Sequence, residues 1–133
     1  MRIYITSKQI IANKDVIVQF ESELGNGIGQ WKGKPLEPEI HSWYFVELKV
    51  GETEFVWGMN IIESSERVEK LDIESNNLMV IQGKIEVIDN KENYCLLRLG
   101  NSLFSLGTAT IPRQIGDYIQ VKSKKLLLFN ENL

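Results

Sequence analysis

The chain has 133 residues, of which 43% are hydrophobic and 25% are charged, and its formal net charge is −3. This composition excludes a disordered chain, and the length is typical of one domain, residues 1–133, with its own core. A single cysteine, Cys95, excludes an internal disulfide framework. We see no apolar run long enough for a signal peptide or a membrane span, so we expect a cytoplasmic protein.

Short β-rich runs separated by glycine and asparagine turns dominate the sequence. Residues 64–72 fit either a short helix capped by Ser64 or Ser65 or the start of a strand, and both alternatives stay open. The pattern predicts an all-β fold, an antiparallel barrel or sandwich of about 8–10 short strands with at most one short helix. The expected strands cover residues 2–5, 15–20, 42–50, 53–62, 78–89, 94–99, 102–106, 117–122 and 125–129.

The turn Gly51-Glu52 predicts a hairpin between residues 44–50 and 53–61. In that register, alternate residues of the two strands form one continuous apolar face. The opposite face then carries Trp43 and Phe45 among charged side chains. This second face is expected to be either an exposed binding surface or a surface covered by the remaining strands.

Two more hairpins are predicted further along the chain. A turn at Gly100-Asn101 places Cys95 opposite Leu106 on a core-facing side. A turn at Ser123-Lys124 would pair the last two strands with each other. That register would set two lysines, Lys122 and Lys125, side by side at some cost in stability.

The second half of the chain resembles the five-strand series of an OB-type barrel. The resemblance rests on the number and spacing of the strands and on the Gly116-Asp117 turn. Barrels of this type bind single-stranded nucleic acid through cations and stacking aromatic rings. The resemblance therefore implies an alternative nucleic-acid site formed by Lys84, Arg98, Arg113, Tyr118, Lys122, Lys124 and Lys125.

The glycine-rich stretch GNGIGQWKGKP, residues 25–35, does not fit a phosphate-binding loop. In such a loop Gly-Lys is followed by Ser or Thr, whereas Gly33-Lys34 is followed by Pro35. The spacing of the glycines also fails the dinucleotide fingerprint, and no helix is expected next. We therefore expect a mobile connection between strands, with Trp31 as its one adhesive residue.

The sequence contains little material for catalysis. With one histidine, His41, and one cysteine, neither a zinc site nor a Cys-His pair is expected. Paired carboxylates are plentiful, so an acid pair of the glycosidase type stays open. We expect no enzyme, no cofactor and no metal.

The distribution of charge points to a protein partner. Residues 21–74 contain twelve acidic and five basic side chains, and an acidic surface favours encounter with basic partners, although it can also serve solubility alone.

The leading hypothesis is a non-catalytic protein-binding module with an acidic, aromatic-bearing surface. A bacterial inhibitor or immunity protein that neutralises a basic toxin or nuclease would be one example. The expected anchors are Trp31, Trp43 and Phe45, with Glu37, Glu39, Glu47 and Glu54 as the charged ring around them. Besides nucleic-acid binding, a small carbohydrate-binding or hydrolytic β domain stays open.

Overall fold

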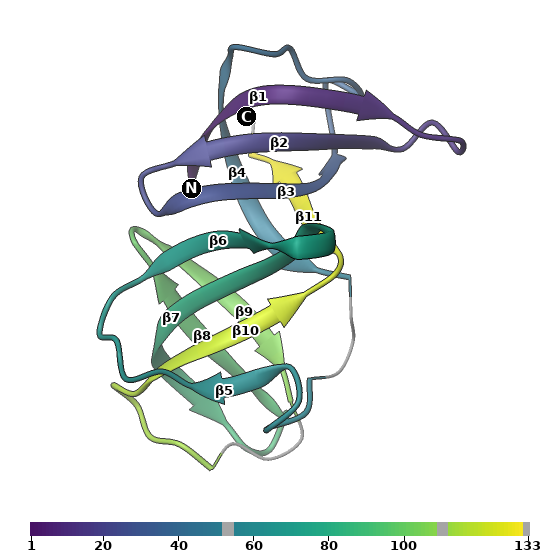
Figure 1. The fold of residues 1–133 in the computed structure, drawn as a ribbon. Coiled ribbons are helices and arrows are strands. Elements are labelled where there is room, and N and C mark those ends of the chain that lie inside the picture. The colour runs from purple at the N-terminus through teal and green to yellow at the C-terminus, as the bar shows by residue number, and fades with distance from the viewer. Residues whose placement is uncertain (52–54, 109–111, 132–133) are drawn as a thin grey trace.

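The computed structural model describes residues 1–51, 55–108 and 112–131, and these residues confirm the all-β prediction (Figure 1). They form eleven strands, slightly more than expected, and one 3-10 turn, η1 (Ser75–Asn77). The strands are β1 (Arg2–Ile10), β2 (Val16–Ser22), β3 (Gly25–Lys32), β4 (Trp43–Val50), β5 (Ile61–Glu63), β6 (Lys70–Glu74), β7 (Leu78–Asp89), β8 (Tyr94–Leu99), β9 (Ser102–Gly107), β10 (Tyr118–Ser123) and β11 (Leu126–Asn130).

Five of these strands close into a barrel, which we call the ring: β1, β2, β3, β11 and β4. Antiparallel pairs join β1 to β2, β2 to β3, β11 to β4 and β4 back to β1. The remaining contact, between β3 and β11, is parallel. This strand order is consistent with an OB-type barrel. The OB-like prediction placed the barrel in the second half, however, whereas the ring uses the first fifty residues and the last strand.

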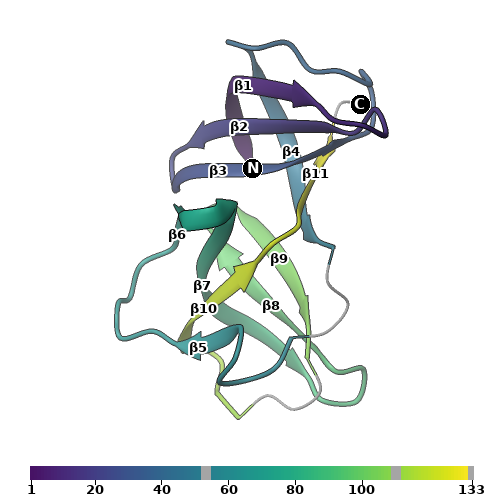
Figure 2. The same cartoon turned by 45° about the vertical axis from the view of Figure 1, so that its right-hand side comes forward.

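The other six strands, β5 to β10, form what we call the second sheet, which lies below the ring in Figures 1 and 2. Its order is β6-β7-β10-β5, and β8 and β9 continue from the far half of the long strand β7. A register shift between Ile85 and Val87 marks an irregularity in β7 where β8 pairs with it. The second sheet joins the ring at a parallel contact between Gly25 of β3 and Leu71 of β6.

One hydrophobic cluster runs through both parts of the molecule. Inward residues of the ring, such as Ile3, Phe20 and Val46, belong to the same cluster as Leu97 and Ile119 of the second sheet. Each of these side chains alternates along its strand with more exposed neighbours, as expected for sheets with one buried face. The ring and the second sheet therefore share a continuous core.

The segment 64–72 contains no helix, and its end forms strand β6 from Lys70 onward. The stretch before β6 is held in place by Gln82, a buried glutamine of β7. Its Nε2 donates to the Val68 carbonyl oxygen at 2.8 Å, and its Oε1 accepts from the Ser64 hydroxyl at 2.9 Å. These bonds satisfy both ends of a side chain that is fully shielded from solvent.

Of the three predicted hairpins, only the one at Gly100-Asn101 is confirmed, with Cys95 opposite Leu106. The hairpin between residues 44–50 and 53–61 is wrong, because β4 pairs with β1 and β11, whereas Phe55 bridges to Thr108 and Trp57 to Ile61. Part of its turn, residues 52–54, lies outside the described residues. The hairpin at Ser123-Lys124 is also wrong, since β10 pairs with β5 and β7 while β11 crosses into the ring.

The ring leaves no space for a side chain at Gly27, which lies opposite Phe20. A Cβ at this position would come within 2.2 Å of the Phe20 phenyl group. We expect Gly27→Ala to lower the free energy of unfolding by about 1–3 kcal/mol through overpacking, as measured by urea denaturation. In a Phe20→Leu background the same change should cost less, and an equal cost in both backgrounds would contradict this packing.

Candidate functional site

The outer surface of β4 carries two large exposed aromatic side chains. Val46 and Leu48 point into the ring and are 0% and 6% exposed, so the alternate residues of the strand point outward. Trp43 and Phe45 are 53% and 62% exposed. We call the surface formed by these two residues with Arg2, Tyr4 and Glu47 the aromatic face.

Neighbouring strands support the aromatic face from both sides. Tyr4 of β1 is the cross-strand partner of Trp43, and their ring centroids are 5.1 Å apart. The Arg2 guanidinium lies 4.1 Å from the centroid of the Trp43 ring, at cation–π distance. On the β11 side, the backbone N–H of Glu131 donates to the Phe45 carbonyl oxygen at 2.8 Å.

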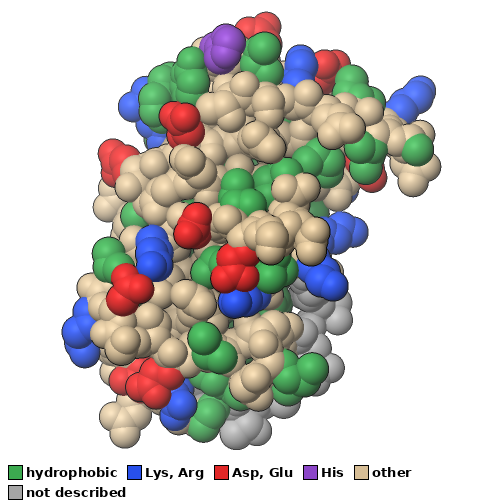
Figure 3. Space-filling model, in the orientation of Figure 1, with side chains coloured by type: hydrophobic (Ala, Val, Ile, Leu, Met, Phe, Trp, Pro, Cys, Tyr) green, Lys and Arg blue, Asp and Glu red, His purple; other side chains and the backbone are tan. Residues whose placement is uncertain are grey.

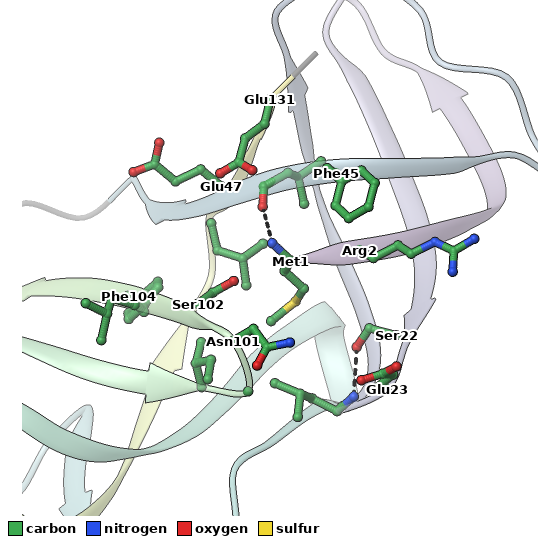
Figure 4. A pocket seen from close by; sticks show the side chains of 16 residues that line it. Met1, Arg2, Ser22, Glu23, Phe45, Glu47, Asn101, Ser102, Phe104 and Glu131 are labelled. Carbon is green, nitrogen blue, oxygen red and sulfur yellow. Dashed lines mark hydrogen bonds between the residues drawn. The ribbon is translucent and has the colours of Figure 1, made fainter. Parts of the chain in front are cut away.

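A cleft of about 530 Å³ adjoins the aromatic face at Phe45 and Glu47 (Figure 4). It lies between the start of β1, the turn from β2 to β3 and the turn from β8 to β9. Its lining combines apolar side chains with three carboxylates, Glu23, Glu47 and Glu131. Figure 4 shows Glu47 and Glu131 on one side of the cleft and Glu23 on another, with the Met1 side chain between them.

Trp31 does not belong to this exposed surface, because it is only 4% exposed. The glycine-rich stretch is strand β3 rather than a mobile connection, and Trp31 packs inside the ring against the edge of Tyr44, at 4.9 Å between centroids. The indole N–H donates to the Pro35 carbonyl oxygen at 2.7 Å. The indole of Trp31 is therefore not accessible to a partner.

The four predicted carboxylates are in different situations. Glu47 shares the outer side of β4 with Trp43 and Phe45. Glu37 forms an ion pair with Lys8 at 2.8 Å, and Glu39 is exposed in the loop that precedes β4. Glu54 lies outside the described residues.

The sequence did not indicate that Glu23 and Glu131 belong near Glu47. One follows β2 and the other follows β11, at opposite ends of the chain. Only the closure of the ring brings both to the cleft, so no local pattern could have identified them.

The predicted basic site consists largely of cations that already have acidic partners. Lys84 and Arg98 both lie near Glu86, with N···O distances of 3.6 and 3.4 Å. Arg113 pairs with Glu63 at 3.2 Å and Lys122 with Glu74 at 3.1 Å. Arg67 lies over the ring of Tyr118 at 5.5 Å, and Lys124 and Lys125 are in the connection from β10 to β11.

Such pairing reduces the positive potential that a phosphate backbone would meet. On the side of the molecule shown in Figure 3, acidic and basic side chains are interspersed.

The cysteine and the histidine lie in different parts of the fold. Cys95 is buried in the second sheet, and burial raises the pKa of its thiol to about 11. His41 is exposed near the ring, where it stacks with Tyr4 at 6.3 Å between centroids. Among the described residues, no group of three or more His, Cys, Asp or Glu side chains could hold a metal ion.

Comparisons with family models, with curated proteins and with solved structures find no match to this chain. In the part of the chain that the structure describes, no helix has the length and apolar character needed to cross a membrane.

The contrast between the exposed Trp43 and the buried Trp31 can be measured. We expect Trp31→Ala to lower the free energy of unfolding by about 3–5 kcal/mol, because it leaves a cavity in the ring. Trp43→Ala should cost only about 1 kcal/mol, mainly from the lost contact with Arg2. Chemical denaturation of the two variants tests this difference, and equal losses would show that Trp43 is part of the core.

Cys95 also gives a pH dependence with a definite sign. Its pKa is about 11 in the folded chain against a reference value of 9.0, so the unfolded chain loses the thiol proton first. The free energy of unfolding should therefore fall as pH rises from about 9 to 11. Cys95→Ala removes this contribution while other groups still titrate, so its stability should fall less steeply. Identical slopes for the two proteins would contradict the assignment.

Proposed function

We propose that this chain is a non-catalytic protein-binding module that docks on its partner through the aromatic face. The observation that carries the proposal is the pair Trp43 and Phe45, both more than half exposed and adjacent on the same side of β4. Large aromatic side chains exposed together are uncommon on a monomer surface and are enriched at the centres of protein interfaces.

The backbone under these side chains supports the same role. Strand β4 is hydrogen-bonded to β1 on one edge and to β11 on the other. A partner would therefore meet a strand whose backbone is already fixed, and little backbone entropy would be lost on binding.

The charges around the aromatic face favour a basic partner. Three carboxylates, Glu23, Glu47 and Glu131, line the adjoining cleft and outnumber its two cations, the N-terminal amino group and Arg2, which also lies over Trp43. Carboxylates at an interface speed association with a basic protein and help to select it. A bacterial inhibitor or immunity protein that blocks a basic toxin would satisfy these conditions, and this finer assignment stays a prediction.

Nucleic-acid binding has weaker support. OB-type barrels bind single strands on the surface of their second and third strands. In this ring, the outward residues of β2 and β3 include Gln19, Glu21, Asn26 and Ile28, none of which is aromatic. Stacking rings are the main source of affinity for single strands, so this surface lacks the expected chemistry.

The proposal is tested by quantitative capture from a nuclease-treated lysate of the organism that makes the protein. The double variant Trp43→Ala/Phe45→Ala should retain its fold and lose affinity for the captured protein by at least about thirtyfold, since truncating one hot-spot residue costs about 2 kcal/mol. Met59→Ala, which removes a 78% exposed side chain between β4 and β5, is the control and should bind like the parent chain. Unchanged capture by the double variant would refute the proposal.

A further inference from the structure

We infer that the cleft beside Phe45 receives a lysine or arginine side chain from an extended segment of the partner protein. This inference rests on the proposed function and specifies the partner's chemistry. The aromatic face would hold the partner from outside, while the basic side chain would enter the cleft between the ring and the second sheet.

The charges of the cleft are the first argument. The side chains of Glu23, Glu47 and Glu131 have no ion-pair partner among the described residues. Two cations also line the cleft: Arg2, whose guanidinium lies 4.1 Å from the centroid of the Trp43 ring, and the N-terminal amino group of Met1, which donates to the Val46 carbonyl oxygen at 2.9 Å. The contacts of both cations are to uncharged groups, so the carboxylates outnumber the cations by one. An incoming cation would therefore meet a cleft with a net negative charge and carboxylates that form no ion pair.

The apolar lining is the second argument. Met1, Leu24, Phe45 and Leu103 line the cleft together with the carboxylates, and Phe45 and Leu103 are 62% and 44% exposed. A lysine or arginine side chain has an aliphatic stem that can cover such a surface while its charged end reaches the acidic groups. A small inorganic cation would gain nothing from the apolar part. The combination therefore favours a basic side chain.

The third argument is an open strand edge beside the cleft. Among the described strands β9 pairs with β8 alone, and its residues Ser102, Leu103 and Phe104 line the cleft. Farther along the other edge of β9, the Gly107 carbonyl oxygen accepts from the Phe55 N–H at 3.2 Å. The part of this edge near Leu103 offers backbone groups to an extended segment, as in strand addition. A volume of about 530 Å³ exceeds what one side chain needs, so part of the adjoining backbone can enter as well.

The inference is tested by NMR titration of the full chain with two blocked pentapeptides. One is acetyl-Ala-Leu-Arg-Leu-Ala-amide, and the other has citrulline, an uncharged analogue of similar shape, in place of arginine. With the arginine peptide we expect saturable shifts of the backbone amides of Leu24, Asn101, Ser102 and Leu103. The citrulline peptide should bind at least about tenfold more weakly, because it cannot make the charge-assisted contacts.

A set of variants separates the cleft from the total charge of the protein. Changing Glu23, Glu47 and Glu131 together to Gln should weaken the arginine peptide by at least about tenfold. The matched control changes Glu66, Glu69 and Glu92, none of which lines the cleft, to Gln and alters the net charge equally. It should have little effect in 0.15 M salt, where distant surface charges are screened.

Three results would overturn the inference: equal affinity for the two peptides, shifts located outside the cleft, or no shift at about 10 mM peptide. With the captured partner, full affinity of the triple Gln variant would also overturn it. If Trp43→Ala/Phe45→Ala then still lost the partner, the proposed function would stand without the cleft. If the arginine peptide bound in the cleft while Trp43→Ala/Phe45→Ala captured the partner as well as the parent chain does, only the proposed function would fail.

Discussion

The parallel pairing of β11 with β3 is the constraint on which the rest of the structure depends. It places Leu127, Leu128 and Phe129 beside residues 30–32 and closes the ring. Because the closing strand comes from the end of the chain, the whole second sheet is inserted between β4 and β11. Both parts must then pack on one continuous core, since β10 runs directly into the strand that completes the ring.

Ring closure also determines which surface stays open. At Trp43–Phe45 one edge of β4 is paired with β1, and β11 pairs with the strand from Val46 onward, so another chain would meet chiefly the outer side chains of this part of β4. Trp43 and Phe45 are on that outer side because Val46 and Leu48 are needed in the core. Exposure of the two aromatic rings is thus a geometric consequence of closure, whereas closure does not by itself require aromatic residues at these positions.

The sequence predicted what depends on neighbouring residues and missed what depends on distant ones. The hairpin at Gly100-Asn101 is local, and the two-residue alternation that puts Trp43 and Phe45 on one side of a strand does not depend on the partner strand. The hairpin after β4 failed because a distant strand, β11, takes that edge. Residues 25–32 were expected to be a loop, yet Gly27 and Gly29 occupy strand positions: a Cβ at Gly27 would collide with Phe20, and one at Gly29 would be in tight contact with Leu126 and Leu128. The predicted loop also left the burial of Trp31 unpredicted.

The cleft also depends on residues that are distant in the sequence. Its carboxylates come from the turn after β2, from β4 and from the residue after β11, and its far wall is the turn between β8 and β9. The β11–β4 pairing brings Glu131 beside Phe45, and the contact between Gly25 and Leu71 holds the second sheet against the ring. The aromatic face and the cleft are therefore supported by the same pairings. A partner that binds both would bind only the folded chain, in which the ring and the second sheet are joined, so the stability of the fold would rise with the ratio of partner concentration to dissociation constant.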